Sequence, residues 1–383
     1  MDKPTVQDIF HRFYPAYLDQ YSPSLVQAKV AHNIMNCKTG AYGANVCVCE
    51  DCGFVQIHYN SCRNRCCPMC QAVPKEMWMD ARREDVLDAP YFHLVFTVPD
   101  ILNPVIYSNQ RLLYDALYHA ASSTISELTA DPKHLGAKVG YICILHTWGS
   151  EMNFHPHIHT ILLGGGLASN NQWKDNGENF FLPIRVISKM FRGKYLEELK
   201  RLWEEDKLVF HGTAEKFRNH YTFKELLDSC YGMDWIPHCK KTFNGAQTVI
   251  KYLGKYTHRI AVSNHRIVRM DDDTVTFLVK DYRNEGQWKE LTISGVEFVR
   301  RFLMHVPPRR FVRIRHYGLL CSRTKSQKLT LCRNLLGCKK YLSKLRDMEM
   351  PEILEHLYGI KVCVCKACGG NLGKPQMRMP LRC

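Results

Sequence analysis

The sequence has no stretch of roughly twenty consecutive apolar residues, which is the length that a transmembrane helix requires. The first residues, with Asp2, Asp8 and His11, also lack the charged and then apolar pattern of a secretory signal. No internal repeat or low-complexity run is evident, which argues against a solenoid or a long disordered arm. We therefore expect a globular protein of the cytoplasm, without a membrane partner.

Acidic side chains are comparatively few in this chain of 383 residues. Thirty-seven Asp and Glu stand against 52 Lys and Arg, which gives a net charge of +15 and a pI of about 9.0. Such an excess of positive charge favours a polyanionic partner and makes nucleic acid the leading candidate. A hydrophobic content of 45% is ample for the cores of two or three domains. The protein is expected to associate with the nucleoid when it is bound to DNA.

Cysteine, by contrast, is abundant, and eight of the 18 cysteines fall between residues 37 and 70. A reducing cytoplasm makes metal binding a better explanation than disulfides for clustered Cys-x-x-Cys pairs. Cys49-Glu-Asp-Cys52 and Cys67-Pro-Met-Cys70 have the spacing of zinc knuckles, so we expect these four thiolates to share one structural zinc. The remaining four would bind a second, interleaved zinc, with His32 and His58 as substitutes: Cys37, Cys47, Cys62 and Cys66.

The other cysteines form two groups. Those scattered through the chain are expected to be small buried apolar side chains, namely Cys143, Cys230, Cys239, Cys321, Cys332 and Cys338. A cluster near the C-terminus predicts a third zinc site, made by Cys363, Cys365, Cys368 and Cys383. We therefore expect two or three zinc ions per chain.

Two further motifs carry chemistry. His157 and His159 flank one apolar residue on a predicted strand, and alternate strand residues point to the same side, so this pair can hold a divalent metal. Tyr252 and Tyr256 are four residues apart in a segment, 246–258, that is predicted to be helical, so both phenols lie on one helix face. A metal facing two tyrosines indicates cleavage of a phosphodiester through a covalent tyrosine.

Two imidazoles leave a metal under-coordinated, so a third protein ligand is expected. His146 is the first choice because it ends the predicted strand 139–147, which would pair with the strand that carries His157. Gln247 and Glu151 are the alternatives. His155 is expected to be a neighbour of the metal pair, and His93 is expected to be structural.

Neither motif is specific by itself, because a His-x-His pair often consists of ordinary polar residues and a Tyr-x-x-x-Tyr pair is usually core packing. Their combination with zinc knuckles and a charge of +15 favours a nuclease. Two tyrosines also permit two successive covalent attachments to DNA, which is strand transfer as well as cleavage.

Basic residues provide candidate DNA contacts. Lys251, Lys255 and Arg259 lie beside the tyrosines and could bind phosphate, although a solvated basic helix face explains them equally well. The segment 299–315 is dense in arginine and predicts a DNA-facing surface that includes Arg309, Arg310 and Arg313. Binding through these side chains should weaken steeply with salt.

Five blocks follow one another between Cys37 and Leu336. They are the zinc module, Phe92-His-Leu-Val-Phe-Thr-Val-Pro99, Leu145-His-Thr-Trp-Gly149, His155-Pro-His-Ile-His159, and the segment from Tyr252-Leu-Gly-Lys-Tyr256 to Asn264. Their order closely resembles that of rolling-circle insertion-sequence transposases of the two-tyrosine HUH class, the insertion sequence ninety-one type. One difference is Asn45, which stands where relatives have a histidine, so Cys47 would supply the missing zinc ligand.

The resemblance implies an α+β fold, in which an HUH nuclease palm, an antiparallel sheet with helices on one side, follows a small zinc-binding domain. It implies magnesium or manganese at His157 and His159, and Tyr252 and Tyr256 as nucleophiles that form a 5′-phosphotyrosine. Its implied partners are single-stranded DNA at element ends and target DNA, and its implied activity is rolling-circle transposition. The oligomeric state is not indicated.

We expect four parts along the chain. Residues 1–89 form N-terminal helices and the zinc-binding domain, 90–265 the endonuclease domain, 266–345 a basic DNA-binding β/α extension, and 346–383 a C-terminal tail with a zinc knuckle. A replication initiator that nicks a plasmid or phage origin would share every catalytic residue. A non-catalytic zinc DNA-binding protein is the remaining alternative, although it would need neither the histidines nor the tyrosines.

Overall fold

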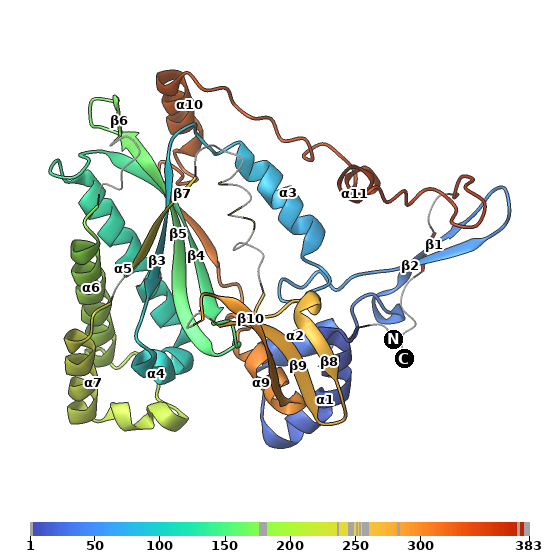
Figure 1. Ribbon diagram of the computed structural model, residues 1–383, viewed down its shortest axis with the longest axis horizontal. Helices are drawn as coiled ribbons and strands as arrows, with labels where there is room; N and C mark the ends of the chain where they lie inside the picture. Colours follow the sequence, from blue (N-terminus) through green and yellow to red (C-terminus); the bar gives the residue numbers. More distant parts are fainter. Residues whose placement is uncertain are drawn as a thin grey trace.

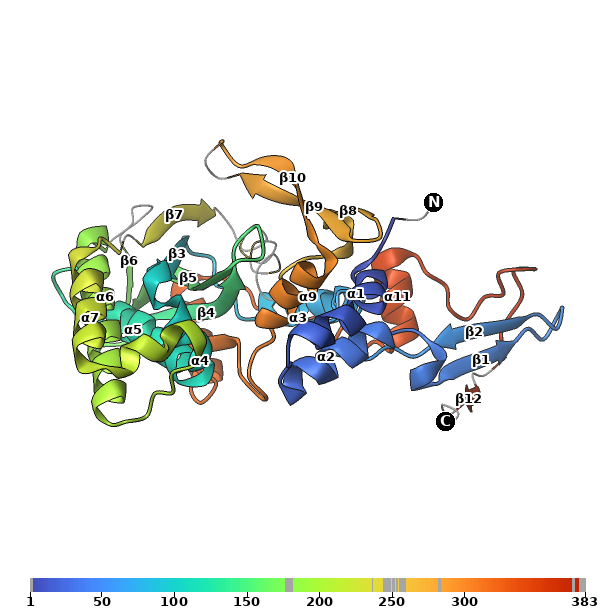
Figure 2. The same cartoon turned by 90° about the horizontal axis from the view of Figure 1, so that it is seen from below.

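The computed structural model describes residues 3–175, 182–235, 237–243, 249, 252, 254, 260–281, 284–373 and 376–378. These residues form an elongated molecule, with a large sheet and its helices at one end and a small β-sheet module at the other (Figure 1, Figure 2). A bundle of N-terminal helices lies between the two ends (Figure 1). Within this part of the chain, no helix is long and apolar enough to cross a membrane.

The large sheet is antiparallel, with strand order β11-β4-β5-β3-β7 and β6 paired to β5. Its strands are β3 (Tyr91–Thr97), β4 (Lys138–Trp148), β5 (Phe154–Leu167), β6 (Trp173–Asp175), β7 (His238–Phe243) and β11 (Ile314–Gly318). The predicted pairing of β4 with β5 is confirmed, and its register places His146 directly opposite His157. The hairpin that the sequence pattern predicts therefore places the three histidines on two neighbouring strands inside the sheet.

Helices cover one face of this sheet. They are α4 (Asn103–Ser108), α5 (Gln110–Ala130), α6 (Ile184–Glu204) and α7 (His220–Gly232). Because strand side chains alternate, Tyr141, Cys143 and Leu145 of β4 point to these helices and join the largest hydrophobic core. The expected α+β architecture, an antiparallel palm with a layer of helices, is confirmed.

The other face of the sheet carries the alternate side chains of the same strands. Ile142 and Ile144 of β4 and Ile161 of β5 form a smaller core with α3 (Ala72–Arg83) and α10 (Lys325–Leu336). Val249 is buried in this core and Tyr252 packs against it. His146, His157 and His159 follow the same alternation, so they open onto the side of the sheet where Tyr252 lies.

A second core joins segments that are far apart in the sequence. It contains α1 (Val6–Gln20), α2 (Leu25–Met35), β8 (Ile267–Met270), β9 (Thr274–Asp281), β10 (Gln287–Ser294) and α9 (Gly295–Met304). The rings of Phe10 and Phe302 meet edge to face at 5.2 Å, and the helices pack closely (Figure 2). Two parts of the predicted division, 1–89 and 266–345, therefore share one core.

The module at the far end is a three-stranded sheet in the order β12-β1-β2. Its strands are β1 (Ala44–Val48), β2 (Val55–Tyr59) and, from the C-terminal end of the chain, β12 (Gln376–Arg378). A hairpin from the N-terminal part of the chain and a strand from its C-terminal part therefore meet in this module.

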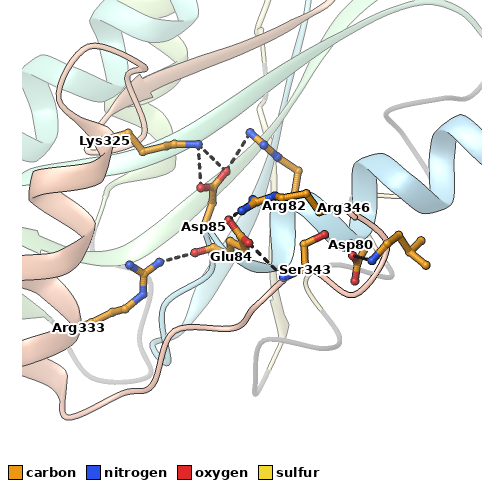
Figure 3. A network of polar contacts seen from close by, with 9 residues as sticks. Asp80, Arg82, Glu84, Asp85, Lys325, Arg333, Ser343 and Arg346 are labelled. Atoms are coloured by element: carbon orange, nitrogen blue, oxygen red, sulfur yellow. Dashed lines mark hydrogen bonds and ion pairs between the residues drawn. The ribbon is translucent and has the colours of Figure 1, made fainter. Parts of the chain in front are cut away.

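The C-terminal segment reaches that module by crossing α3, which spans Ala72–Arg83. Helix α3 ends at Arg83 because the amide of Asp85 bonds to the carbonyl of Arg82 (2.9 Å), a tight turn that breaks the helical ladder. The turn presents Glu84 and Asp85 to the C-terminal segment and to α10 (Figure 3).

The crossing is held by carboxylates of α3 and its C-terminal turn (Figure 3). Asp80 accepts hydrogen bonds from the hydroxyls of Tyr341 and Ser343 (both 2.6 Å) and from the amide of Leu345 (2.9 Å). Glu84 pairs with Arg346 (2.6 Å), and these partners hold the pKa values of Asp80 and Glu84 below their ordinary range despite partial burial. Beyond this anchor the chain continues through α11 (Met350–Tyr358) to the small sheet (Figure 1).

Candidate active site and zinc clusters

Three histidines on adjacent strands form the candidate metal centre. His146 comes from β4, and His157 and His159 come from β5. All three are buried, and one ring nitrogen of each lies within 4.8 Å of the others. The Nε2 atoms of His157 and His159 are 3.1 Å apart. The structure thus brings together the predicted histidine pair and the first-choice third ligand.

Hydrogen bonds fix how two of these rings present their nitrogens. His157 Nδ1 lies 2.7 Å from the backbone carbonyl of His155, so it donates a proton there and leaves the Nε2 lone pair facing the other histidines. His159 likewise turns Nε2 toward His157 and Nδ1 toward His93. This orientation, in which Nδ1 is held by a neighbour and Nε2 faces a shared point, is typical of metal-ligating histidines. The three side chains therefore fit a divalent cation.

His93 and Tyr252 extend the cluster away from this point. His93 Nε2 lies 2.9 Å from His159 Nδ1, and His93 Nδ1 lies 2.7 Å from the hydroxyl of Tyr252. Burial on β3 lowers the pKa of His93 to about 4, so the ring is neutral near physiological pH. One imidazole thus separates the tyrosine hydroxyl from the candidate metal ligands.

The sequence pattern predicts a structural role for His93 and does not indicate this link. A signal was present, because an imidazole within the apolar strand Tyr91–Thr97 must find hydrogen-bond partners when it is buried. Five other predicted residues lie outside the described part of the chain: Gln247, Lys251, Lys255, Tyr256 and Arg259. Glu151, the other alternative ligand, is exposed and pairs with Lys289 instead.

The cysteines form two clusters of four thiols. The first contains Cys37, Cys62, Cys67 and Cys70, whose sulfur atoms lie within 4.8 Å of one another. Cys70 Sγ is 3.4 Å from Cys37 Sγ and 3.6 Å from Cys62 Sγ, and hydrogen bonds from the neighbouring thiols of Cys62 and Cys67 lower the pKa of Cys70. Four sulfurs at such separations match a tetrahedral zinc site.

The second cluster contains Cys49, Cys52, Cys365 and Cys368. Cys49 Sγ is 3.5 Å from Cys368 Sγ, and Cys52 Sγ is 3.7 Å from Cys365 Sγ. Hydrogen bonds from the backbone amides of Cys368 and Ala367 lower the pKa of Cys365 to about 7, which favours the thiolate.

The predicted grouping of cysteines is therefore wrong in three respects. The two knuckles, Cys49 with Cys52 and Cys67 with Cys70, belong to different clusters because the hairpin β1–β2 carries the first knuckle away from the second. Cys47 and Cys66 are buried but belong to neither cluster. Cys363 is exposed and outside the C-terminal half-site, and Cys383 lies outside the described residues. His32 and His58 instead contact Asn36 and Gln56.

Comparison with known proteins gives these sites a context. Residues 9–98 match the family described as "Transposase zinc-binding domain", and residues 140–328 match the family described as "Putative transposase". The "Putative transposase y4qJ" of Sinorhizobium fredii is 40% identical over 95% of this chain and 93% of its own length. The "Transposase for insertion sequence element IS801" of Pseudomonas savastanoi is 30% identical over 79% of this chain and 72% of its own. The chain belongs to this transposase family.

Solved structures show a much looser likeness to the transposase. Two structures of the conjugative relaxase TrwC with oriT DNA, one metal-free and one copper-bound, cover 45% and 67% of the chain. They cover 67% and 99% of their own chains, at 15% and 12% identity and TM-scores of 0.23 and 0.26. A likeness at these TM-scores says nothing about the function of the site.

The predicted arginine surface is only partly exposed in the transposase. Arg309 and Arg310 follow α9 and are exposed. Arg313 is partly enclosed beside Cys66 and Arg65, and burial lowers its pKa. Arg65 itself reaches from the zinc module to the carbonyl of Phe311 (2.5 Å) and thereby links the module to this segment. Arg309 and Arg310 are thus better placed than Arg313 to contact phosphate.

Proposed function

We propose that this transposase cleaves single-stranded DNA at the ends of its element by attack of a tyrosine, and transfers the cut strand to target DNA in rolling-circle transposition. The observation that carries the proposal is the continuous contact from Tyr252 through His93 to the histidine cluster. Membership in the transposase family favours this activity over a replication initiator with the same chemistry. It also favours element ends over a replication origin as the DNA substrate.

His146, His157 and His159 would hold the divalent cation, which supplies polarisation of the scissile phosphate and neutralises the negative charge that develops on it. Among the described residues no carboxylate joins the three histidines. Imidazole ligands suit later transition metals better than magnesium, which prefers oxygen. Of the two cations expected from the sequence, manganese fits this ligand set better.

The hydrogen bonds assign a proton to each ring once Nε2 of His159 is used as a ligand. The proton of His159 then resides on Nδ1 and is donated to His93 Nε2. His93 in turn carries its proton on Nδ1 and donates it to the hydroxyl oxygen of Tyr252. A hydrogen bond donated to the phenol oxygen favours its negatively charged, nucleophilic form. His93 is therefore a positioning residue that couples the state of His159 to Tyr252.

In the covalent step, the Tyr252 oxygen forms a bond to the scissile phosphorus and the bond from phosphorus to the 3′-oxygen of the departing strand breaks. The phenolic proton is lost to solvent and the departing 3′-oxygen gains a proton. The 5′-phosphotyrosine conserves the bond energy, so a 3′-hydroxyl of target DNA can reverse the step and join the strands. A second nucleophile, Tyr256, would allow a second strand to be cut while the first stays attached.

Substitution of the tyrosines tests this proposal. Labelled single-stranded DNA from the element ends, incubated with protein and manganese, is expected to give a covalent adduct that migrates slowly on a denaturing gel and is lost with chelator. The adduct should survive at least one of the changes Tyr252→Phe and Tyr256→Phe and disappear in the double variant. DNA binding should persist in the double variant, since phenylalanine keeps the ring of each tyrosine and removes only its hydroxyl. An adduct of undiminished yield in the double variant would disprove tyrosine attack.

Substitution of His93 tests the coupling. His93→Phe removes both hydrogen bonds, so metal affinity and the rate of adduct formation should each fall about 10- to 100-fold. His93→Gln places a carbonyl oxygen near the position of Nε2, so it should restore metal affinity by accepting from His159 but leave adduct formation slow. Calorimetric titration with manganese and single-turnover gels measure the two effects separately. A His93→Phe variant with normal metal affinity and normal adduct rate would contradict the positioning role.

A further inference from the structure

The second cysteine cluster draws its members from opposite ends of the chain. Cys49 and Cys52 lie on the β1–β2 hairpin, whereas Cys365 and Cys368 follow α11. The family zinc-binding domain matches residues 9–98 and so includes only the first pair. Two thiols do not complete a structural zinc site, which is almost always four-coordinate. The N-terminal domain by itself therefore has half of this site.

The two halves have the same local structure. Each is a Cys-x-x-Cys-Gly turn: Cys49-Glu-Asp-Cys52-Gly53 and Cys365-Lys-Ala-Cys368-Gly369. Both glycines have positive φ, 70° for Gly53 and 78° for Gly369, which other residues rarely adopt. In each turn the glycine amide donates to the carbonyl of the first cysteine, at 3.1 Å and 3.0 Å. Two equivalent knuckles that face each other are the arrangement of a zinc ribbon.

Backbone amides are also directed at the sulfurs of the C-terminal knuckle. The amide of Ala367 donates to Cys365 Sγ and the amide of Gly370 donates to Cys368 Sγ, both at 3.4 Å. Such bonds stabilise thiolates, the form in which cysteine binds a metal. The turn thus directs one backbone amide at each of these two sulfurs.

Backbone pairing joins the two knuckles into one sheet. Strand β12 pairs with β1, from Ala44 opposite Arg378 to Val46 opposite Gln376. The amide of Glu50 donates to the carbonyl of Asn371 (3.2 Å), and the amide of Gly373 donates to the carbonyl of Val48 (2.9 Å). The C-terminal segment therefore pairs with the hairpin both along β1 and beside the first knuckle.

This sheet has little apolar core to hold it together. Five large apolar side chains of the hairpin are 43 to 52% exposed, namely Val48, Phe54, Val55, Ile57 and Tyr59. A short hairpin without a buried face is marginally stable in water, and domains that lack a core commonly depend on a metal. Cys49 and Cys365, each 2% exposed, are the members of the module buried at the meeting point of the knuckles. The geometry calls for a metal at that point.

We propose that Cys49, Cys52, Cys365 and Cys368 bind one zinc ion and that this ion closes the transposase chain by joining the C-terminal segment to the N-terminal zinc module. The segment is already fixed to α3 through Asp80 and Glu84 (Figure 3), so the zinc anchors the far end of a strap that begins at the nuclease palm. The strap sets the position of the zinc module relative to the palm. This site is independent of the cleavage chemistry.

Mapping of reactive thiols in the full-length, zinc-loaded protein tests the proposal. Cys52, Cys363 and Cys368 are all exposed, so burial would not protect any of them from an alkylating reagent. Peptide mass spectrometry should find Cys363 modified while Cys52 and Cys368 are protected, and all three modified once a chelator has removed the zinc. Modification of Cys368 as fast as Cys363, with the protein fully loaded, would overturn the split site.

Zinc content provides a second measurement. Cys365→Ser combined with Cys368→Ser should lower the content by one ion per chain and make Cys52 reactive, whereas Cys363→Ser should change neither. Any zinc at the histidine cluster is common to all variants and cancels in the comparison. A double variant with full zinc content and a protected Cys52 would overturn the proposal. If the double variant does not fold, thiol mapping of the unaltered protein still decides.

Discussion

His157→Ala is expected to lower the rate of DNA cleavage by roughly 100- to 1000-fold and to raise the manganese concentration needed for half-maximal adduct formation. His157 lies directly opposite His146 in the sheet and within 3.1 Å of His159, so its loss removes one of three imidazoles from the candidate metal centre. The effect should be measured as the single-turnover rate of adduct formation across a manganese titration. Metal affinity, measured by calorimetry, should fall in parallel.

His155→Ala is the matched control for this change. His155 is two residues away on the same strand; its side chain lies 3.3 Å from exposed Asp100 and its ring lies beside that of His157 (centroids 5.2 Å), but it does not belong to the cluster. The bond that orients His157 uses the backbone carbonyl of His155, which alanine retains. The control variant should therefore cleave within about threefold of the unaltered protein, since surface substitutions have small effects. Equal losses in both variants would show a general structural effect and contradict the metal centre.

The strands and the histidine cluster could be predicted because local patterns determine them. Alternation in the His155-Pro-His157-Ile-His159 segment sets which side chains share a face, and the short connection to the preceding strand sets the antiparallel pairing. Together these two facts bring His146 to His157 without knowledge of the rest of the fold. Strand alternation and pairing do not predict which residue Tyr252 contacts, because Tyr252 belongs to a separate segment of the chain. Its contact with His93 depends on packing against the sheet.

The cysteine ligands could not be assigned correctly from the sequence, because equal Cys-x-x-Cys spacing does not show which knuckles bind the same zinc ion. The three thiols that share a cluster with Cys67 are near it in sequence, so proximity gave the right residues for half of that site. Cys49 and Cys52, however, pair with residues more than 300 positions away, as the separation of 313 between Cys52 and Cys365 shows. The pairing of β12 with β1 brings this partner to the hairpin. The glycine that follows both knuckles, Gly53 and Gly369, marks them as alike, but it does not show that they meet in space.

The same long-range packing explains the shared core of α1 with α9. Residues 1–89 and 266–345 each have an amphipathic pattern, but neither pattern says which face covers which. Phe10 meets Phe302, and the amide of Val6 donates to the side chain of Asn264 (3.1 Å). These contacts place the N-terminal helices against the hairpin β9–β10 and against helix α9, which follows it.

Cys67→Ser is expected to have the largest effect on stability. Cys67 is fully buried and belongs to the first cluster, so serine would remove one of four zinc ligands and leave three thiols that bind zinc weakly. Because binding of a structural zinc is coupled to folding, the loss should lower the free energy of unfolding by several kcal/mol, about 3 to 5. Urea unfolding, followed together with zinc release, measures both quantities.

Cys66→Ser is the control that isolates the metal contribution. Cys66 is the preceding residue, is also buried at 7% exposure, and lies outside both clusters. Burial raises the pKa of its thiol, so it is a neutral side chain that serine can replace at a cost of about 1 kcal/mol with no loss of zinc. If Cys66→Ser releases zinc and Cys67→Ser does not, the first cluster is assigned wrongly. If only Cys67→Ser releases zinc, the neighbouring cysteines have separate roles, one as a ligand and one as core.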